Sequence, residues 1–418
     1  MKWFLKLDKS LRQYLLVTFN YWNFTITDGA LRMLVVLYFY QLGYSPLNIA
    51  LLFLFYEIFG VITNLVGGWL GARVGLNRTM NIGLGMQVFA LLLLTVPSEW
   101  LAIPWVMMAQ ALSGIAKDLN KMSAKSSIKT LIPNNQQGKL YHWVAVLTGS
   151  KNALKGAGFF IGGLLLTLVG FQIALVIMAT VLAVVFITSL LFLEGDLGKA
   201  KTKPKFSQMF SKSAPVNILS AARLFLFASR DVWFVVALPI YLASIFGWPH
   251  SVVGAFLAAW VIAYGIVQGF APKITAYFSK NSAAPNDTAT NGTAPNGKSA
   301  MLWCSLLAVV TGILALTIDL EWQVQWVITI GLLIFGAIFA VNSSLHSYLI
   351  ISYAKQDGVS LDVGFYYMAN AMGRLVGTVL SGWVYQAYGF AACLWIAFAF
   401  LVITSIISLK LPESGNKP

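Results

Sequence analysis

Residues 156–193, GAGFFIGGLLLTLVGFQIALVIMATVLAVVFITSLLFL, run without a single charged side chain. A helix of about 20 apolar residues crosses the hydrocarbon core of a bilayer, and this stretch is about twice that length. Gly170 lies inside it, and glycine readily adopts the backbone conformations that tight turns between helices require. The stretch therefore predicts two membrane-spanning helices, 141–169 and 171–193, joined as a hairpin at Gly170.

The composition of the whole chain is that of a polytopic membrane protein. Its 418 residues are 58% hydrophobic and only 10% charged, whereas a soluble domain carries about 25% charged residues. Further apolar runs bring the expected number of spans to twelve, and the fold class to an all-α membrane protein. Besides the hairpin, the runs are 13–41, 46–72, 79–97, 100–126, 217–246, 250–278, 300–318, 322–353, 362–388 and 390–410.

The basic residues outside the spans follow the alternation of the connections. With the N-terminus placed in the cytoplasm, the outer connections hold no Lys or Arg and only the acids Glu99, Asp319 and Glu321. Positive residues favour the cytoplasmic side of a membrane. We therefore expect a multi-pass protein of the cell inner membrane with both termini in the cytoplasm.

The spans divide into two groups of six. We expect an N-terminal half, 1–193, and a C-terminal half, 217–418, joined by a basic cytoplasmic linker, 194–216. Within the second half, the low-complexity segment 279–299 is predicted to be a disordered cytoplasmic loop.

Two spacings recur in the two halves. Asp28 lies 18 residues before Pro46, and Asp231 lies 18 residues before Pro249. A basic residue followed by two glycines also recurs, as Lys155-Gly158-Gly163 and Arg374-Gly377-Gly382. Parallel six-span repeats are typical of transporters whose site lies near the membrane midplane, at the interface of the repeats.

Charged residues inside the predicted spans indicate a polar site. Each costs roughly 2.5–3.5 kcal/mol at the centre of a spanning helix, so it is retained only where it faces protein or water. Four are acidic: Asp28, Glu57, Asp118 and Asp231. Eight are basic: Arg32, Lys117, Lys121, Lys151, Lys155, Arg223, Arg230 and Arg374.

Pairing and snorkelling explain some of these charges. Asp28 and Arg32 are four residues apart on one helix face, so they form a usable pair. Arg223 and Lys121 lie near the inner ends of their spans, from which long side chains reach the membrane interface. Four acids neutralise at most four bases, so two bases remain without a partner.

Two pairs of lysines sharpen the argument. Lys117 and Lys121 are four residues apart, as are Lys151 and Lys155, and like charges at this spacing repel. At about 1.5 Å per residue, Lys151 and Lys155 lie roughly 15 and 21 Å into their span. Stacked lysines at that depth need an anion, or one of them loses its proton. We therefore expect an anion-binding site, with structural pairing inside the protein as the alternative.

The predicted site combines residues from both halves. Glu57 is the first candidate to hold a coupling proton, because its own helix offers no base within four residues. The predicted ion-pair or proton-coupling residues are Asp28, Glu57, Asp118 and Asp231. The predicted substrate-binding residues are Arg32, Lys117, Lys121, Lys151, Lys155, Arg230, Arg374, Asn152 and Asn370.

Other chemistry is not predicted. His142, His250 and His346 are scattered without a second ligand at metal spacing, and we expect them to be hydrogen-bonded structural residues. The chain has no phosphate-binding glycine loop, so we expect no ATP hydrolysis, no cofactor and no enzymatic activity.

Two six-span halves with a basic linker resemble the major facilitator superfamily. The segment GWLGARVGLNR, residues 68–78, resembles that superfamily's loop motif between spans 2 and 3, with Ala72 where an Asp is usual. Gly149, Gly158 and Gly162 resemble part of the span-5 antiporter motif, with Gly163 in place of the following proline.

Four stretches more narrowly resemble the ArsJ family of organoarsenical efflux permeases. They are NYWNFTITDGALRMLVV (20–36), LSGIAKDLNKMSAKSSIK (112–129), GSKNALKGAGFF (149–160) and SAARLFLFASRDVWFVVALP (220–239). The resemblance implies efflux of 1-arseno-3-phosphoglycerate and a contribution to arsenate resistance. It also implies a functional partner, a glyceraldehyde-3-phosphate dehydrogenase that makes this ester from arsenate.

The residues themselves favour an oxyanion over trivalent arsenic, because Cys304 and Cys393 are isolated and make a poor thiol site. Several alternatives stay open. An organophosphate:phosphate exchanger uses the same basic residues and needs no proton. A multidrug exporter typically has an apolar cavity with a lone acid. A membrane-embedded enzyme needs clustered His, Asp or Glu at a membrane face.

Overall fold

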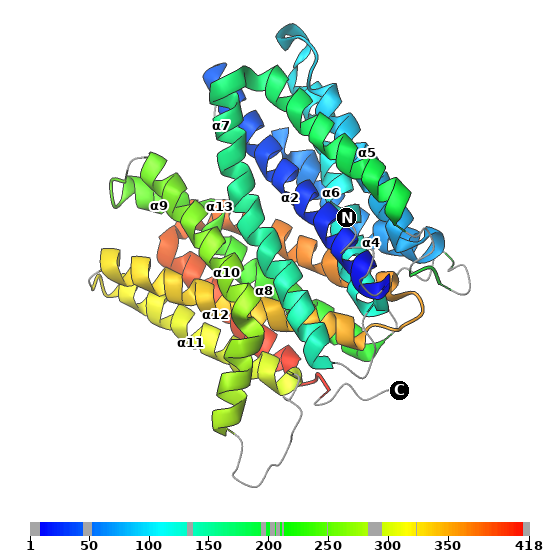
Figure 1. The fold of residues 1–418 in the computed structure, drawn as a ribbon. Helices are drawn as coiled ribbons and strands as arrows, with labels where there is room; N and C mark the ends of the chain where they lie inside the picture. The colour runs from blue at the N-terminus through cyan, green and yellow to red at the C-terminus, as the bar shows by residue number, and fades with distance from the viewer. Residues whose placement is uncertain are drawn as a thin grey trace. The chain divides into compact units, whose positions relative to one another are not determined.

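The computed structural model of the chain is helical throughout its described secondary structure (Figure 1). The residues it describes are 9–44, 52–131, 137–193, 198–200, 205, 210, 213–248, 250–282, 295–322 and 324–412.

The helices follow the predicted apolar runs closely. The first part of the chain forms α2 (Lys9–Gln41), α4 (Leu54–Val74), α5 (Leu76–Leu93), the short η1 (Ser98–Trp100), α6 (Ile103–Leu131) and α7 (Gln137–Phe192). The second part forms α8 (Ala214–Phe234), α9 (Ala237–Ser244), α10 (His250–Ser282), α11 (Gly297–Asp319), α12 (Val324–Tyr353) and α13 (Val359–Ser408).

Helices α7 and α13 each contain two spans. Gly170 inside α7 has φ 78° and ψ 175°, and Gly389 inside α13 has φ 80° and ψ −175°, so the helical path breaks at both residues. A positive φ is cheap only for glycine. The break predicted at Gly170 is therefore confirmed, and Gly389 forms an equivalent break between the predicted spans 362–388 and 390–410.

The predicted span 217–246 is not one continuous helix. It breaks between α8 and α9, and the backbone amides of Val236 and Ala237 donate to the hydroxyl of Ser381 on α13, at 3.3 and 3.1 Å. Pro239 follows in the first turn of α9, where its missing N–H needs no helical partner. The break thus moves the proline to a tolerated position, and Ser381 satisfies the freed amides.

The ends of the predicted disordered loop are helical. Helix α10 continues through Ser282, and α11 begins at Gly297 behind a capping box formed by Asn296 and Ser299. That part of the prediction for 279–299 is wrong, and residues 283–294 lie outside the described residues.

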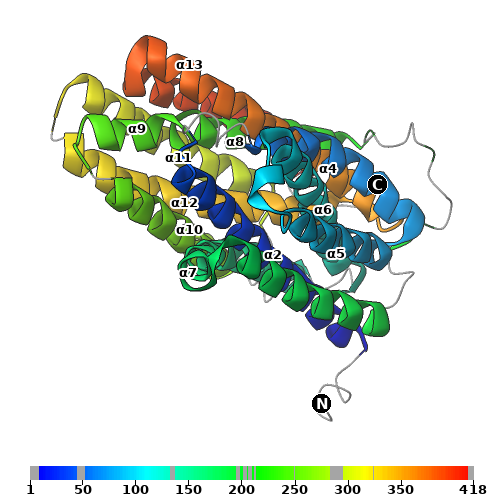
Figure 2. The ribbon, with the colours of Figure 1, turned by 90° about the horizontal axis from the view of Figure 1, so that it is seen from above.

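The chain divides into two compact units. The first unit comprises residues 1–135, 154–211 and 354–368, and the second comprises 136–153, 212–353 and 369–418. In the first unit, α4 and α5 pack against α6, as Figure 2 shows. Helices α7 and α13 contribute residues to both units, α7 changing unit after residue 153 and α13 after residue 368.

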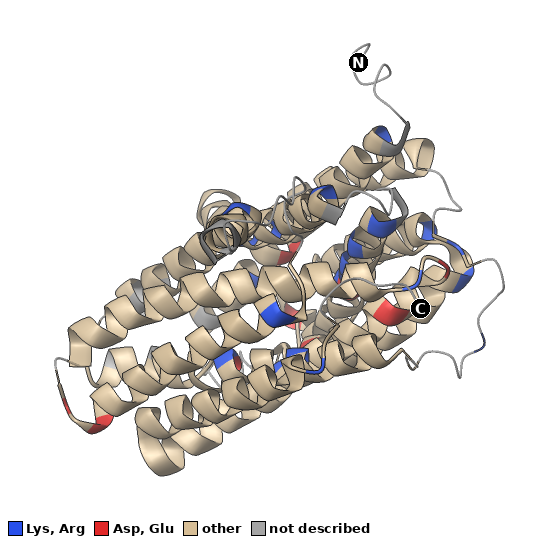
Figure 3. Cartoon of the chain, turned by 90° about the horizontal axis from the view of Figure 1, so that it is seen from below, with Lys and Arg blue, Asp and Glu red and all other residues tan. Residues whose placement is uncertain are grey.

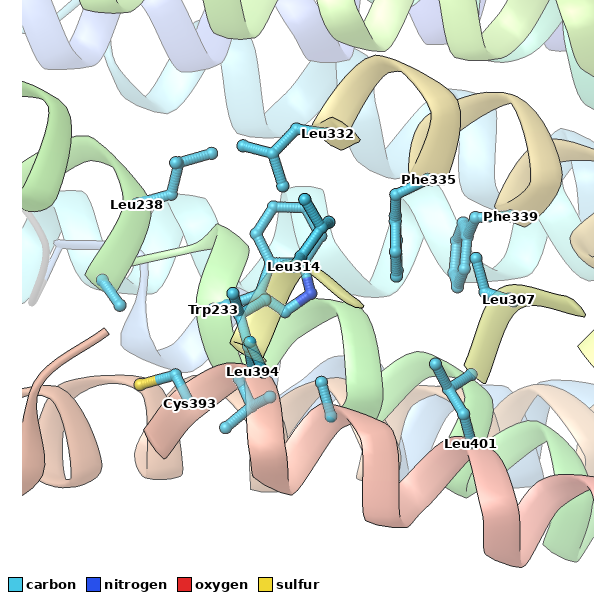
Figure 4. Packing of buried hydrophobic residues seen from close by; sticks show 14 of the residues in the cluster. Trp233, Leu238, Leu307, Leu314, Leu332, Phe335, Phe339, Cys393, Leu394 and Leu401 are labelled. Carbon is cyan, nitrogen blue, oxygen red and sulfur yellow. The ribbon is translucent and has the colours of Figure 1, made fainter. Parts of the chain in front are cut away.

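The second unit has a dense aromatic and aliphatic core (Figure 4). Trp233 is fully buried and meets Phe335 edge to face, with ring centroids 4.9 Å apart. Phe335 stacks on Phe339 one turn further along α12. Edge-to-face and offset contacts are the favoured geometries of aromatic pairs. This core fixes α8 against α12, the two helices that carry most of the unit's buried polar residues.

Large apolar side chains are exposed on the outer helices. Leu168 and Leu191 on α7 are 69% and 72% exposed. By length and composition, six described helices are suited to cross a membrane: 54–74, 138–192, 255–278, 297–319, 324–353 and 359–408. Apolar surface of this extent is rare on soluble monomers. The chain is a multi-pass membrane protein.

Candidate functional site

Charged residues lie along the helices as well as at their ends (Figure 3). In the first unit, the carboxylate of Asp28 on α2 is 5% exposed and uses both oxygens. Lys155 Nζ on α7 lies 3.3 Å from Oδ2, and the Tyr56 hydroxyl on α4 donates to Oδ1 at 2.6 Å. Lys155 was expected to need a negative partner because it lies deep in its predicted span, and Asp28 is that partner.

Arg32 is paired across helices. Its Nη2 lies 3.1 Å from Glu57 Oε1 on α4, and its guanidinium lies over the rings of Phe53 and Tyr56, at 5.0 and 5.1 Å from their centroids. Arg32 also acts electrostatically on Asp28, the partner expected on its own helix, while its described ion pair is with Glu57. Glu57 was the first candidate for a coupling proton because its own helix lacks a base, and α2 supplies that base.

Lys117 and Lys121 on α6 share one acid. Both ammonium groups contact Asp118, Lys117 at 3.5 Å, and Asp118 is 1% exposed. Lys117 also lies 3.8 Å from the ring centroid of Tyr56. The prediction that Lys121 snorkels to the interface is wrong, because its side chain is 13% exposed and turned to Asp118. The acid between them offsets the repulsion expected of two lysines at this spacing.

Lys125 extends this lysine row and was missed. It lies one further turn along α6, is 4% exposed, and donates to the hydroxyl of Tyr367 on α13. Lys121 and Lys125 lie 4.9 and 4.8 Å from the centroid of the same ring. The recurrence of lysine every four residues from Lys117 is a sequence signal that would have found it.

The second unit has its own charge cluster around Asp231. This aspartate on α8 is fully buried and contacts the guanidinium groups of Arg230 and Arg374, the latter at 3.4 Å from Nε. Arg230 Cζ also lies 4.9 Å from the ring centroid of Phe227 and 5.4 Å from that of Phe339. One carboxylate therefore serves two arginines.

Arg223 is buried rather than snorkelling. It is 3% exposed; its Nε donates to Asn370 Oδ1 at 2.8 Å, and its Nη1 donates to the Ser343 carbonyl at 3.3 Å. Phe227 lies one turn along α8, and its ring centroid is 4.0 Å from Arg223 Cζ. The prediction of an interfacial position is therefore wrong, and Arg223 is a site residue that sequence reasoning left out.

The two predicted asparagines join the same polar network of the second unit. Asn152 on α7 donates to Gln268 at 2.8 Å, and Gln268 donates to the Tyr264 hydroxyl at 3.1 Å. Tyr264 hydrogen-bonds the side chain of Ser343, whose carbonyl accepts from Arg223. The network therefore runs from Asn152 to Asn370, two residues 218 positions apart in the sequence.

Lys151 and Lys155, the two lysines four residues apart on α7, belong to different units. Lys151 belongs to the second unit and Lys155 to the first. Lys151 is partly exposed, next to Asn152. Lys155 has its counter-charge in Asp28. The need for an external anion therefore does not follow from this pair alone.

In each unit, one ion-pair cluster nonetheless has more cations than carboxylates in its described contacts. Six predicted cations share four carboxylates in the contacts described above, and two of the four carboxylates serve two cations each. Structural pairing, the alternative raised from the sequence, accounts for part of their placement. In these described contacts the cations outnumber the carboxylates by six to four.

The fold and the sequence both match known transporters. Residues 14–285 match the sequence model of the Major Facilitator Superfamily. The chain belongs to the major facilitator superfamily. No curated protein sequence matches it significantly.

Solved structures of superfamily transporters share the fold over nearly the whole chain. A bacterial homologue of the iron transporter ferroportin, in an outward-facing state, has a TM-score of 0.71 at 13% identity and covers 95% of this chain and 98% of its own. The human organic anion transporter TETRAN has 0.72 at 13%, with 96% and 100% covered. The fucose:proton symporter of E. coli has 0.69 at 12%, with 96% and 99% covered. At these identities the likeness establishes the fold alone.

Proposed function

We propose that this superfamily transporter exports an anionic organoarsenical, 1-arseno-3-phosphoglycerate, by alternating access coupled to proton antiport. The observation that carries the proposal is that, in each unit, one buried carboxylate, Asp118 or Asp231, contacts two partly buried cations. The resemblance of four stretches to organoarsenical efflux permeases supports the choice of substrate. Export of this ester contributes to arsenate resistance.

The chemistry of the substrate suits these side chains. It carries a phosphate and a pentavalent arsenate group, and guanidinium forks and ammonium groups are the usual protein partners of such oxyanions. In the empty protein, Asp28, Asp118 and Asp231 hold the cations in place. Substrate oxygens then replace these carboxylates as partners of Lys155, Arg230 and Arg374.

Export against a concentration gradient requires an energy source, and we assign this role to proton antiport. Proton coupling needs a titratable group that is exposed alternately to the two sides of the membrane, and Asp28, Glu57 and Asp231 are the candidates. The orientation proposed from the distribution of Lys and Arg places both termini in the cytoplasm of an inner membrane. The six-helix halves 1–193 and 217–418 are the proposed moving parts.

The experiment uses inside-out membrane vesicles that contain the full chain. Arsenate, glyceraldehyde 3-phosphate, NAD and a glyceraldehyde-3-phosphate dehydrogenase outside the vesicles generate the ester, and trapped arsenic is measured. We expect accumulation that requires the dehydrogenase. Accumulation from arsenate alone, or none in either condition, would contradict the assigned substrate.

A second arm tests the coupling. An imposed pH gradient, acidic inside the vesicle, should raise the accumulation, and an uncoupler should abolish the increase. If collapse of the gradient leaves transport unchanged while internal phosphate accelerates it, the protein is an organophosphate:phosphate exchanger instead.

A further inference from the structure

A run of buried polar residues on α12, NSSLHS (342–347), contains an imidazole without a hydrogen-bond partner. His346 is 0% exposed, and neither Nδ1 nor Nε2 has a partner among the described residues. A neutral imidazole carries one donor and one acceptor, and burying either unpaired lowers stability. No described protein group therefore provides the hydrogen bond expected of a structural histidine, and the ring is a candidate to bind a ligand.

Arg223 supplies the charge beside this ring. Its Nη1 donates to the carbonyl of Ser343, one helical turn before His346 on α12, and it acts on His346 electrostatically. The Nε of Arg223 also donates to the amide oxygen of Asn370. Ser220, one turn before Arg223 on α8, is also buried, and its hydroxyl lacks a partner in the described part of the chain.

The kind of ligand follows from these groups. A metal ion at His346 is disfavoured by the neighbouring guanidinium, and no three metal-ligating side chains gather within the described residues. A guanidinium, an imidazole N–H and a hydroxyl all donate hydrogen bonds, and oxyanions accept them.

We propose that Arg223 and His346 form a subsite for a tetrahedral oxyanion, the phosphate or arsenate group of the substrate. The inference rests on the proposed anion transport and assigns one charged group of the substrate to the second unit. Because His346 is fully buried here, side chains around the ring must rearrange for the oxyanion to enter.

The test measures binding of inorganic phosphate to the purified full chain by calorimetry, together with thermal unfolding without phosphate. His346→Leu removes two unpaired polar atoms and should raise the unfolding midpoint, yet weaken phosphate binding about tenfold or more. Arg223→Gln should weaken binding at least as much. His142→Leu, which changes an exposed histidine of the same unit, should leave binding unchanged.

Three outcomes would overturn the inference: no phosphate binding by the unmodified chain, unchanged affinity in both variants, or a lower unfolding midpoint for His346→Leu with normal affinity. The last result would make His346 a structural residue satisfied by water. Failure of the export function is distinguishable. In that case the vesicles accumulate no ester, while phosphate binding still depends on Arg223 and His346. If the vesicles do accumulate ester and His346→Leu leaves its KM unchanged, the subsite is wrong and the export function stands.

Discussion

Each unit contains one ion pair formed by residues at equivalent positions of the sequence repeat. In the first unit, Lys155 lies 3.3 Å from Asp28; in the second, Arg374 lies 3.4 Å from Asp231. The glycine three residues after each cation packs against the helix that carries the acid. A side chain at Gly158 would meet the Ile26 carbonyl at 2.5 Å, and one at Gly377 would meet the Ala228 carbonyl at 2.8 Å.

The two pairs differ in what else the acid binds. Asp28 accepts a hydrogen bond from Tyr56, a neutral donor, and its cation is 19% exposed. Asp231 binds a second arginine, Arg230, and Arg374 is 36% exposed. In the described ion pairs Asp28 contacts one cation and Asp231 contacts two, and Arg374 is more exposed than Lys155. The comparison indicates that the second pair is better placed than the first to receive an anion.

Replacing the two aspartates should change the stability of the protein most strongly. Loss of one partner from a buried ion pair costs about 3–5 kcal/mol. Asp231→Ala should destabilise the protein more than Asp28→Ala, because Asp231 contacts two guanidinium groups and Asp28 contacts the ammonium group of Lys155. Thermal unfolding of the purified protein measures both. Glu99→Gln, at an exposed acid, should have no effect, and equal losses for the two aspartates would remove the distinction drawn between them.

Alanine at the packing glycines should have the next largest effect. Gly158→Ala and Gly377→Ala place a Cβ within 2.8 Å of backbone oxygen, and such overpacking typically costs 1–3 kcal/mol. Gly163 and Gly382 are the second glycines of the same repeat, and no neighbour lies within 3.4 Å of a Cβ added there. Their alanine variants are the matched controls. A loss at Gly382 as large as at Gly377 would show that helix propensity of the site, not close approach, governs the result.

Tyr56, which donates a hydrogen bond to Asp28, should contribute less to stability than the aspartates and the glycines. Tyr56→Phe removes a hydrogen bond to a charged acceptor, for which about 1.5–3 kcal/mol is typical. The double variant with Asp28→Asn should show coupling between the two residues. If the two losses simply add, the Tyr56 hydroxyl does not act through Asp28.

Most of the helical framework was predictable because membrane burial demands long apolar runs. Gly170 and Gly389 were predictable as breaks because both lie within uninterrupted apolar sequence and tolerate a positive φ. The α8–α9 break was not predicted, although Pro239 is a signal for it. The repeat spacing pointed to Asp28, Lys155, Asp231 and Arg374, and the structure pairs them as Asp28–Lys155 and Asp231–Arg374.

The parts of the site that sequence reasoning missed depend on neighbours from other helices. Arg32 pairs with Glu57, 25 residues away, and no spacing on one helix indicates that contact. Arg223 was placed at the interface from its depth alone, whereas Asn370 and Ser343 hold it inside. Which partner a side chain contacts depends on which faces of neighbouring helices pack together, and the sequence of one helix does not contain that information.

The most direct test of the anion-carrier account compares three variants in the vesicle assay with the ester-generating system. Lys155→Ala and Arg374→Ala should each reduce the arsenic accumulated at least tenfold, with the larger rise in KM for Arg374→Ala. Lys139→Ala, which removes an exposed lysine from the same helix as Lys155, should transport normally. Unchanged accumulation by both Lys155→Ala and Arg374→Ala would contradict the account, because the paired cations would then have no part in carrying the substrate.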